Sequence, residues 1–219
     1  MLTTIVRIVM IKNNTYCEDC VVKVEQRPAT EAHSVYEAFS TTAAIFPEND
    51  FLYIPAQACT AYSEHPVSWR YGEALEAVNA IATAYEVLGI GGGDRVALVL
   101  ENRSEFFLHY LALNSTGACI IPVHAESRIE EMAYLIGAGG ACVVVSLAEH
   151  LDKVRQAIAA VGKAIPCVTP DALQDLPVMG VAHEKPGPDL DSPAAILFTS
   201  GTTGNPKGCV LSNRYFRGW

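Results

Sequence analysis

Short apolar runs alternate with segments of helical periodicity between residues 94 and 168. Each apolar run is four or five residues long, and each segment between two runs repeats its apolar positions at helical spacing. Alternation of this kind predicts an α/β fold, with a mostly parallel sheet and helices on both faces. The predicted strands lie at 96–100, 118–121, 141–145 and 165–168, and the predicted helices at 104–115, 127–136 and 150–161.

Polar residues mark where several helices begin and end. A helix over 35–45 precedes the alternating region. Ser68 is the expected N-cap of a second helix, which Gly89 ends. Ser127 and Glu130 have the spacing of a capping box, which predicts the start of the helix over 127–136.

Residues 1–33 differ in pattern from the rest of the chain. They hold a β-branched run, a polar stretch and the pair Cys17 and Cys20, so we interpret them as an N-terminal extension and residues 34–219 as the domain. The other expected segments are a strand at 51–54, a loop at 56–66, a proline-containing connector at 169–193, a strand at 194–198 and an apolar run at 209–211.

Composition and charge narrow the possible functions. Half of the residues are hydrophobic and the formal net charge is −9, which is typical of an acidic globular protein. Nucleic-acid backbones are bound chiefly by clustered Lys and Arg. The sequence has no such cluster, so we expect no nucleic-acid partner. The apolar stretch at 2–11 contains Arg7 and is shorter than the roughly 20 residues that cross a bilayer, so no integral membrane segment is expected.

The seven cysteines indicate a reducing compartment. Their number is odd, and most lie inside apolar runs, which favours reduced thiols in the cytoplasm. Cys17 and Cys20 form a C-x-x-C pair, which half of a zinc site or a redox pair would use. The sequence has no second C-x-x-C pair, so neither a zinc site nor a redox pair is favoured.

The segment 199–208 has the composition of an anion-binding loop. Four hydroxyl side chains, three glycines and one lysine fall within ten residues, directly after an apolar strand. Glycines let backbone N–H groups turn toward one ligand, hydroxyls add donors, and the lysine adds a full charge. Residues 192–219 contain Lys207, Arg214 and Arg217 but no acidic residue, which fits a polyanion such as a nucleoside triphosphate. A hairpin turn without a ligand is the alternative interpretation.

Two common phosphate-binding motifs do not fit the chain. In the Walker motif Ser or Thr follows the lysine, whereas Gly208 follows Lys207. The glycines near residue 90 follow a helix and precede a strand, which is the reverse of the dinucleotide-binding arrangement.

The segment 197–208 resembles the signature phosphate loop of the adenylate-forming enzymes. This AMP-binding superfamily includes acyl-CoA synthetases, peptide-synthetase adenylation domains and luciferases. The segments 93–97 and 117–123 also resemble the family's turn into its first sheet strand and its small-residue strand ending in proline. The resemblance covers roughly residues 34–219 and implies the first part of the family's N-terminal domain.

The resemblance implies ATP-dependent activation of a small carboxylic acid. In the family the loop holds the β- and γ-phosphates of ATP while the carboxylate attacks the α-phosphate, and a thiol such as CoA then displaces AMP from the acyl-adenylate. Mg²⁺ is expected alongside the triphosphate. By position, Thr199, Ser200, Thr202 and Thr203 would donate hydrogen bonds to phosphate, Gly201 and Gly204 would permit its close approach, and Lys207 would neutralise its charge.

The chain also departs from the family pattern. Family members often have a histidine soon after the lysine–glycine pair, where this chain has Ser212, Asn213 and Arg214. The segment 212–216 faintly resembles that of synthetases acting on carnitine-type or other small acids. The family's later elements, including its catalytic lysine, have no counterpart before Trp219. We therefore assign no catalytic residue and expect this chain alone to be inactive. A non-catalytic α/β fragment that at most binds nucleotide phosphate is the alternative.

The resemblance to the family also leads to an expectation about the stability of this chain. A chain that ends near the phosphate loop would expose sheet edges and core that family members cover with later sequence, so we expect marginal stability or aggregation. The identity of the acid, the choice of acceptor thiol and the oligomeric state do not follow from the sequence.

Overall fold

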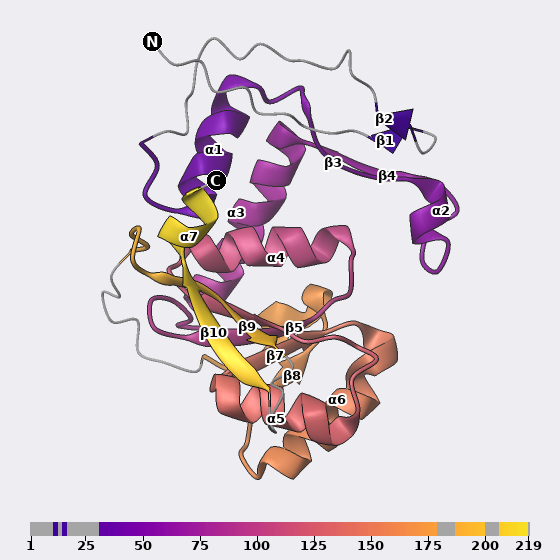
Figure 1. Cartoon of the computed structure of the whole chain (residues 1–219), viewed down its shortest axis with the longest axis vertical. Helices are drawn as coiled ribbons and strands as arrows, with labels where there is room; N and C mark the ends of the chain where they lie inside the picture. The colour runs from indigo at the N-terminus through magenta and orange to yellow at the C-terminus, as the bar shows by residue number, and fades with distance from the viewer. Residues whose placement is uncertain (1–10, 13–14, 17–30, 179–186, 200–205, 219) are drawn as a thin grey trace.

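A six-stranded sheet forms the centre of the structure, a computed structural model (Figure 1). It describes residues 11–12, 15–16, 31–178, 187–199 and 206–218, so Cys17 and Cys20 lie outside the described residues. The strand order is β10-β9-β6-β5-β7-β8, and every neighbouring pair is parallel except β9 and β10. The strands are β5 (Arg95–Val99), β6 (Cys119–Pro122), β7 (Val143–Ser146), β8 (Cys167–Val168), β9 (Pro193–Thr199) and β10 (Lys207–Ser212).

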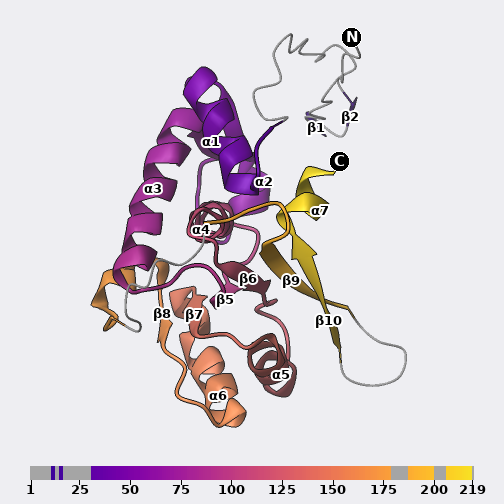
Figure 2. The same cartoon turned by 90° about the vertical axis from the view of Figure 1, so that its left-hand side faces the viewer.

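Helices cover both faces of this sheet, which confirms the predicted α/β architecture (Figure 2). Val96 and Leu98 of β5 point into the core on one face, whereas Ala97 and Val99 point into the core on the other. Burial on both faces explains why the strands are continuous apolar runs without alternation. The first face carries α1 (Val35–Ile45), α3 (Tyr71–Val87) and α4 (Ser104–Ser115), and the second carries α5 (Ile129–Gly139) and α6 (Leu151–Val161).

Two of the predicted helix starts are wrong. Ser68 lies inside β4 (Val67–Arg70), which pairs with β3 (Asp50–Ile54), and α3 begins only at Tyr71. Ser68 therefore takes part in the pairing of β4 with β3, although its local sequence pattern is that of a helix N-cap. Ser127 closes a turn by donating its N–H to the His124 carbonyl at 3.1 Å, and Arg128 is the N-cap residue of α5.

Short helices occupy segments that the sequence analysis interprets as loop or connector. They are α2 (Ala56–Cys59) and η2 (Pro170–Asp175). The structure adds η1 (Ala148–His150), which leads into α6, the two-residue strands β1 (Ile11–Lys12) and β2 (Thr15–Tyr16), and the helix α7 (Asn213–Arg217). Leu173 of η2 is 2 % exposed and packs in the first core, so the start of the connector closes that side of the domain.

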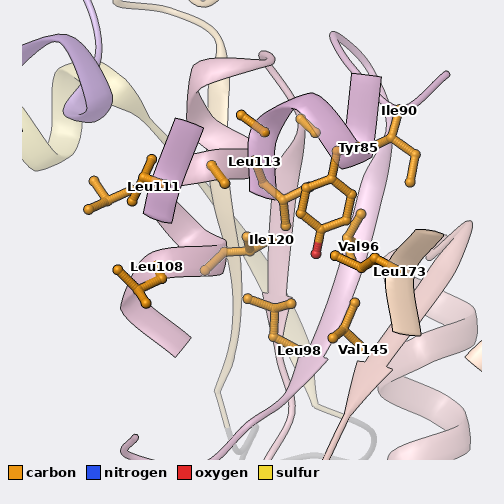
Figure 3. Close-up of a cluster of buried hydrophobic side chains, with 14 of the residues drawn as sticks. Tyr85, Ile90, Val96, Leu98, Leu108, Leu111, Leu113, Ile120, Val145 and Leu173 are labelled. Atoms are coloured by element: carbon orange, nitrogen blue, oxygen red, sulfur yellow. The ribbon is translucent and has the colours of Figure 1, made fainter. Parts of the chain in front are cut away.

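The first core surrounds a buried polar pair. Figure 3 shows the Tyr85 ring of α3 among Leu98, Val145 and Leu173. The Tyr85 hydroxyl lies 2.7 Å from His109 Nδ1, and both side chains are almost fully buried. Burial lowers the pKa of His109 to about 4, so the imidazole is neutral at pH 7.

No helix in the described part of the chain is long and apolar enough to span a membrane.

Candidate functional site

The hairpin formed by β9 and β10 carries both ends of the predicted phosphate loop. Thr199 ends β9, Lys207 begins β10, and the two residues lie directly opposite each other in the antiparallel register. The structure thus brings these two predicted site residues together, and both are exposed. The predicted site residues Ser200, Gly201, Thr202, Thr203 and Gly204 lie outside the described residues.

Gly208 is required by packing within this hairpin. It lies opposite Phe198, and a Cβ at Gly208 would come within 3.2 Å of the Phe198 ring and of Ile196 Cγ2. A larger residue would have to push the ring aside, which would disturb the strand pair next to Lys207. Gly208 therefore follows Lys207 for a structural reason as well as by motif.

Tyr134 of α5 holds both ends of the loop in place, a role that the sequence analysis missed. Its hydroxyl donates to the Pro206 carbonyl at 3.1 Å. Its ring meets Phe198 edge-on, with centroids 6.3 Å apart and an angle of 75° between the planes. Phe198 precedes Thr199 and Pro206 precedes Lys207, so one side chain contacts the hairpin on both strands.

An open depression of about 570 Å³ lies between the hairpin and α5. Its charged lining residues are Arg95 and Lys207, and no Asp or Glu lines it in the described part of the chain. Nothing in the sequence pattern assigns Arg95 to this site. Its guanidinium donates to the Gly139 carbonyl at 2.9 Å and so reaches from the start of β5 to the end of α5. The depression is therefore positive and suits an anionic ligand.

The three basic residues of the C-terminal segment lie at opposite ends of β10. Lys207 lies at the loop end of β10, whereas Arg214 follows the other end and binds the Asp191 carboxylate through two hydrogen bonds of 2.9 and 3.1 Å. The Arg214 guanidinium lowers the pKa of Asp191, mainly by hydrogen bonding. Arg217 lies beyond that same end, in α7. Of the three basic residues predicted to favour a polyanion, only Lys207 is at the hairpin end.

Ser212 and Asn213, where family members often have a histidine, have structural roles. Ser212 caps α7 by accepting from the Tyr215 N–H at 3.4 Å. Asn213 is fully buried, and its Oδ1 accepts from Asn114 Nδ2 at 2.8 Å and from the Val35 N–H at 3.2 Å. These bonds tie α7 to α4 and α1, so the departure from the family pattern belongs to the domain's packing.

Comparison with known proteins identifies the family. The family described as AMP-binding enzyme matches residues 42–217. The chain belongs to the AMP-binding enzyme family. This result confirms the resemblance carried by residues 197–208, and with it the membership of an adenylate-forming ligase family.

A curated relative in the family is the crotonobetaine/carnitine–CoA ligase of Escherichia coli, including strain K12 / DH10B. It is 33 % identical over an alignment of 163 positions, which covers 68 % of this chain and 31 % of the relative. The chain therefore spans about a third of the length of the curated relatives it matches.

Solved structures support the fold. The N-terminal subdomain of Klebsiella oxytoca NpsA matches with a TM-score of 0.66 at 25 % identity, over 83 % of this chain and 42 % of that one. A fatty acyl-adenylate ligase from L. pneumophila, in complex with acyl adenylate and pyrophosphate, also gives 0.66, at 16 % identity, over 86 % of this chain and 32 % of that one. Both matches share the fold described above, and the first of them is to an N-terminal subdomain.

Proposed function

We propose that this chain supplies the ATP phosphate-binding part of an acid–thiol ligase. The observation that carries the proposal is the pairing of Thr199 with Lys207, because it places a hydroxyl and a cation together at the two ends of the 199–208 segment. Residues 34–219 would form the incomplete AMP-binding domain, and residues 1–33 an extension.

The donor set at the hairpin fits a triphosphate. Lys207 supplies a full positive charge and Thr199 a hydroxyl, both exposed beside a depression without acidic lining in the described part of the chain. Lys207 would neutralise phosphate charge and Thr199 would donate to a phosphate oxygen. Ser200, Thr202 and Thr203 would add donors, while Gly201 and Gly204 would let the phosphates approach the backbone.

ATP would supply the adenylyl group that activates the acid, and Mg²⁺ would offset the charge of the phosphates. The described lining offers no carboxylate to the metal, so we assign no protein ligand to it. These residues would hold the triphosphate in place while the acid approaches the α-phosphate.

A small carboxylic acid is the proposed substrate and CoA the proposed acceptor. The relative at 33 % identity is named as a crotonobetaine/carnitine–CoA ligase, which supports this choice. A cytoplasmic location and the absence of a nucleic-acid partner stay predictions from composition.

Binding of nucleotide phosphate without turnover is the second candidate function. The lack of a metal-binding carboxylate among the described residues of the depression favours it. The two candidates share the phosphate site and differ only in chemistry, so binding and turnover need separate measurements.

Titration calorimetry with MgATP tests the shared site. We expect saturable binding to the wild-type chain and a loss of about tenfold or more in affinity for Lys207→Ala, because a charge-assisted hydrogen bond contributes roughly 1.5–3 kcal/mol. Lys163→Ala is the matched control, since Lys163 is exposed after the end of α6. Equal affinities for the wild type and Lys207→Ala would overturn the assignment of Lys207.

Exchange of labelled pyrophosphate into ATP distinguishes the two candidates. Ligase chemistry predicts exchange that depends on an added acid, with carnitine, crotonobetaine, acetate and benzoate as the first probes. Saturable MgATP binding together with no exchange for any acid would favour binding without turnover.

A further inference from the structure

A second depression, of about 410 Å³, lies near the edge of the sheet formed by β7 and β8, opposite the edge formed by the β9–β10 hairpin. Leu147 and Ala148 follow β7, and Thr169 and Pro170 follow β8, so it opens at the carboxyl ends of these two parallel strands. The carboxyl ends of the strands are the side on which open α/β sheets bind ligands, although β7 and β8 lie beyond the point at β5 where the strand order reverses. None of the described residues of the phosphate hairpin lines it.

His109 provides a buried polar group in a mostly apolar wall. It lines the depression from α4, together with Ile81 of α3 and Leu108, yet it is only 1 % exposed. The Tyr85 hydroxyl is the one hydrogen-bond partner of its ring within the described ranges, and it lies at Nδ1. Nε2 therefore has no partner among the described residues.

The Tyr85 hydroxyl determines which imidazole nitrogen carries the proton. Burial raises the pKa of Tyr85 well above its usual value, so the phenol keeps its proton. Across the described residues that proton has no acceptor other than His109 Nδ1. An unsatisfied buried donor is costly, so Tyr85 donates to Nδ1 and the neutral imidazole carries its own proton on Nε2. The wall of the depression then presents one N–H donor.

Carboxylates at the depression select the charge of a ligand. Glu105 and Asp171 both line it, and no Lys or Arg lines it in the described part of the chain. The hydrogen bond from Thr169 lowers the pKa of Asp171, so this carboxylate is ionised at pH 7. An anion would meet repulsion here, and the buried N–H donor of His109 requires an acceptor, so the acceptor that fits both is one without negative charge.

We propose that this depression binds a neutral, mainly apolar small molecule with one carbonyl oxygen, a ketone or an amide, whose oxygen accepts a hydrogen bond from His109 Nε2. The apolar part packs against Ile81, Leu108 and Leu147. The site is independent of the phosphate hairpin, so its failure and the failure of the proposed ligase function are separate results.

Three probes of similar size test the ligand chemistry. Acetophenone carries the carbonyl, ethylbenzene lacks an acceptor, and benzoate adds a negative charge. Using histidine labelled with ¹⁵N, NMR reports the tautomer of His109 and its response to each probe. We expect the Nε2-protonated tautomer and a saturable shift of Nε2 with acetophenone. Ethylbenzene should bind at least about fivefold more weakly, because a net hydrogen bond gives roughly that factor. Benzoate can accept the hydrogen bond, but it should also bind more weakly because Glu105 and Asp171 repel its charge.

A substitution at the rim tests the location. Ala148 is exposed and lines the depression, so Ala148→Phe fills its mouth without altering the core. Ala160→Phe is the matched control on the exposed side of α6. We expect Ala148→Phe to abolish the acetophenone shift and Ala160→Phe to leave it unchanged. An Nδ1-protonated His109, equal affinity for all three probes, or an acetophenone shift that survives Ala148→Phe would each overturn the proposal.

Discussion

The two parts of the central sheet differ in what surrounds them. β5 and β7 lie between two layers of helices, and their residues from Val96 to Val99 and from Val143 to Ser146 are at most 1 % exposed. β9 begins in the same core at Ala194, but the hairpin emerges from it, and Leu197 and Val210 are 39 % and 58 % exposed. In the parallel part, packing therefore restricts which residue types are allowed. At the hairpin end, residues such as Lys207 are exposed and can contact a ligand.

This difference also bears on stability within the domain. Local opening costs least where few apolar contacts are buried, and an edge strand such as β10 presents unpaired backbone groups to solvent. The expectation of marginal stability or aggregation concerns exposed sheet edges and core, and it stays a prediction. Substitutions in the two regions should separate effects on folding from effects on binding.

The largest expected effect comes from shortening a side chain in the parallel part. Ile121 of β6 is fully buried and packs so closely on Gly139 of α5 that a Cβ there would approach it to 2.6 Å. We expect Ile121→Ala to lower the free energy of unfolding by about 3–4 kcal/mol in a urea titration, through lost burial and a cavity. Val210→Ala in the hairpin should change it by less than about 0.5 kcal/mol. Equal losses would contradict the comparison.

A pH titration of stability gives the next largest effect. Burial holds the pKa of His109 near 4, below the value of about 6.5 in an unfolded chain. Between these values the unfolded state binds more protons, so stability is fully present above pH 6.5 and is lost as the pH falls toward 4, by about 3 kcal/mol. His109→Gln should remove this part of the pH dependence, while His33→Gln, at an exposed position, should retain it. An unchanged profile for His109→Gln would contradict the burial argument.

The buried amide network near α7 is expected to contribute less. Asn213→Leu removes the acceptor of Asn114 Nδ2 and the donor to the Asp189 carbonyl, leaving both without that partner. We expect a loss of about 2 kcal/mol in thermal or urea unfolding, because unmade buried hydrogen bonds are costly. Asn79→Ala, at an exposed position on α3, should lose far less. A loss no larger than that of Asn79→Ala would remove the structural explanation for Asn213.

The smallest expected change in stability accompanies a change in binding. Tyr134→Phe removes the hydrogen bond to the Pro206 carbonyl but keeps the ring against Phe198. Stability should fall by at most about 1 kcal/mol, whereas MgATP affinity should fall about threefold to fivefold because the end of the loop is held less firmly. Tyr53→Phe is the control, since Tyr53 is 57 % exposed. An affinity loss of the same size in Tyr53→Phe would argue against a positioning role for Tyr134.

The sequence predicted the parallel part of the sheet well because its strands are short apolar runs separated by helical segments. Each predicted strand from 96 to 168 overlaps an observed one, and burial on both faces leaves little choice of residue. Helix starts were harder to predict. Ser68 fits a local cap pattern, but the pairing of β4 with β3 outweighs that preference.

The candidate site was predicted from its motif and not from its surroundings. The pairing of Thr199 with Lys207 follows from a loop between two strands. The contact between Tyr134 and Pro206 spans 72 residues and gives no local signal. The same holds for Arg214, whose partner Asp191 lies 23 residues earlier, so its charge was wrongly counted with that of Lys207.

Hydrogen exchange with and without MgATP shows whether the hairpin binds phosphate. At an MgATP concentration near the Kd of the wild-type chain, we expect MgATP to slow exchange in peptides covering residues 194–212 and to leave those covering β5 and β7 unchanged. The slowing should be much smaller in Lys207→Ala. Slowing confined to other segments, or slowing of 194–212 that is equally large in Lys207→Ala, would rule out a phosphate site at this hairpin.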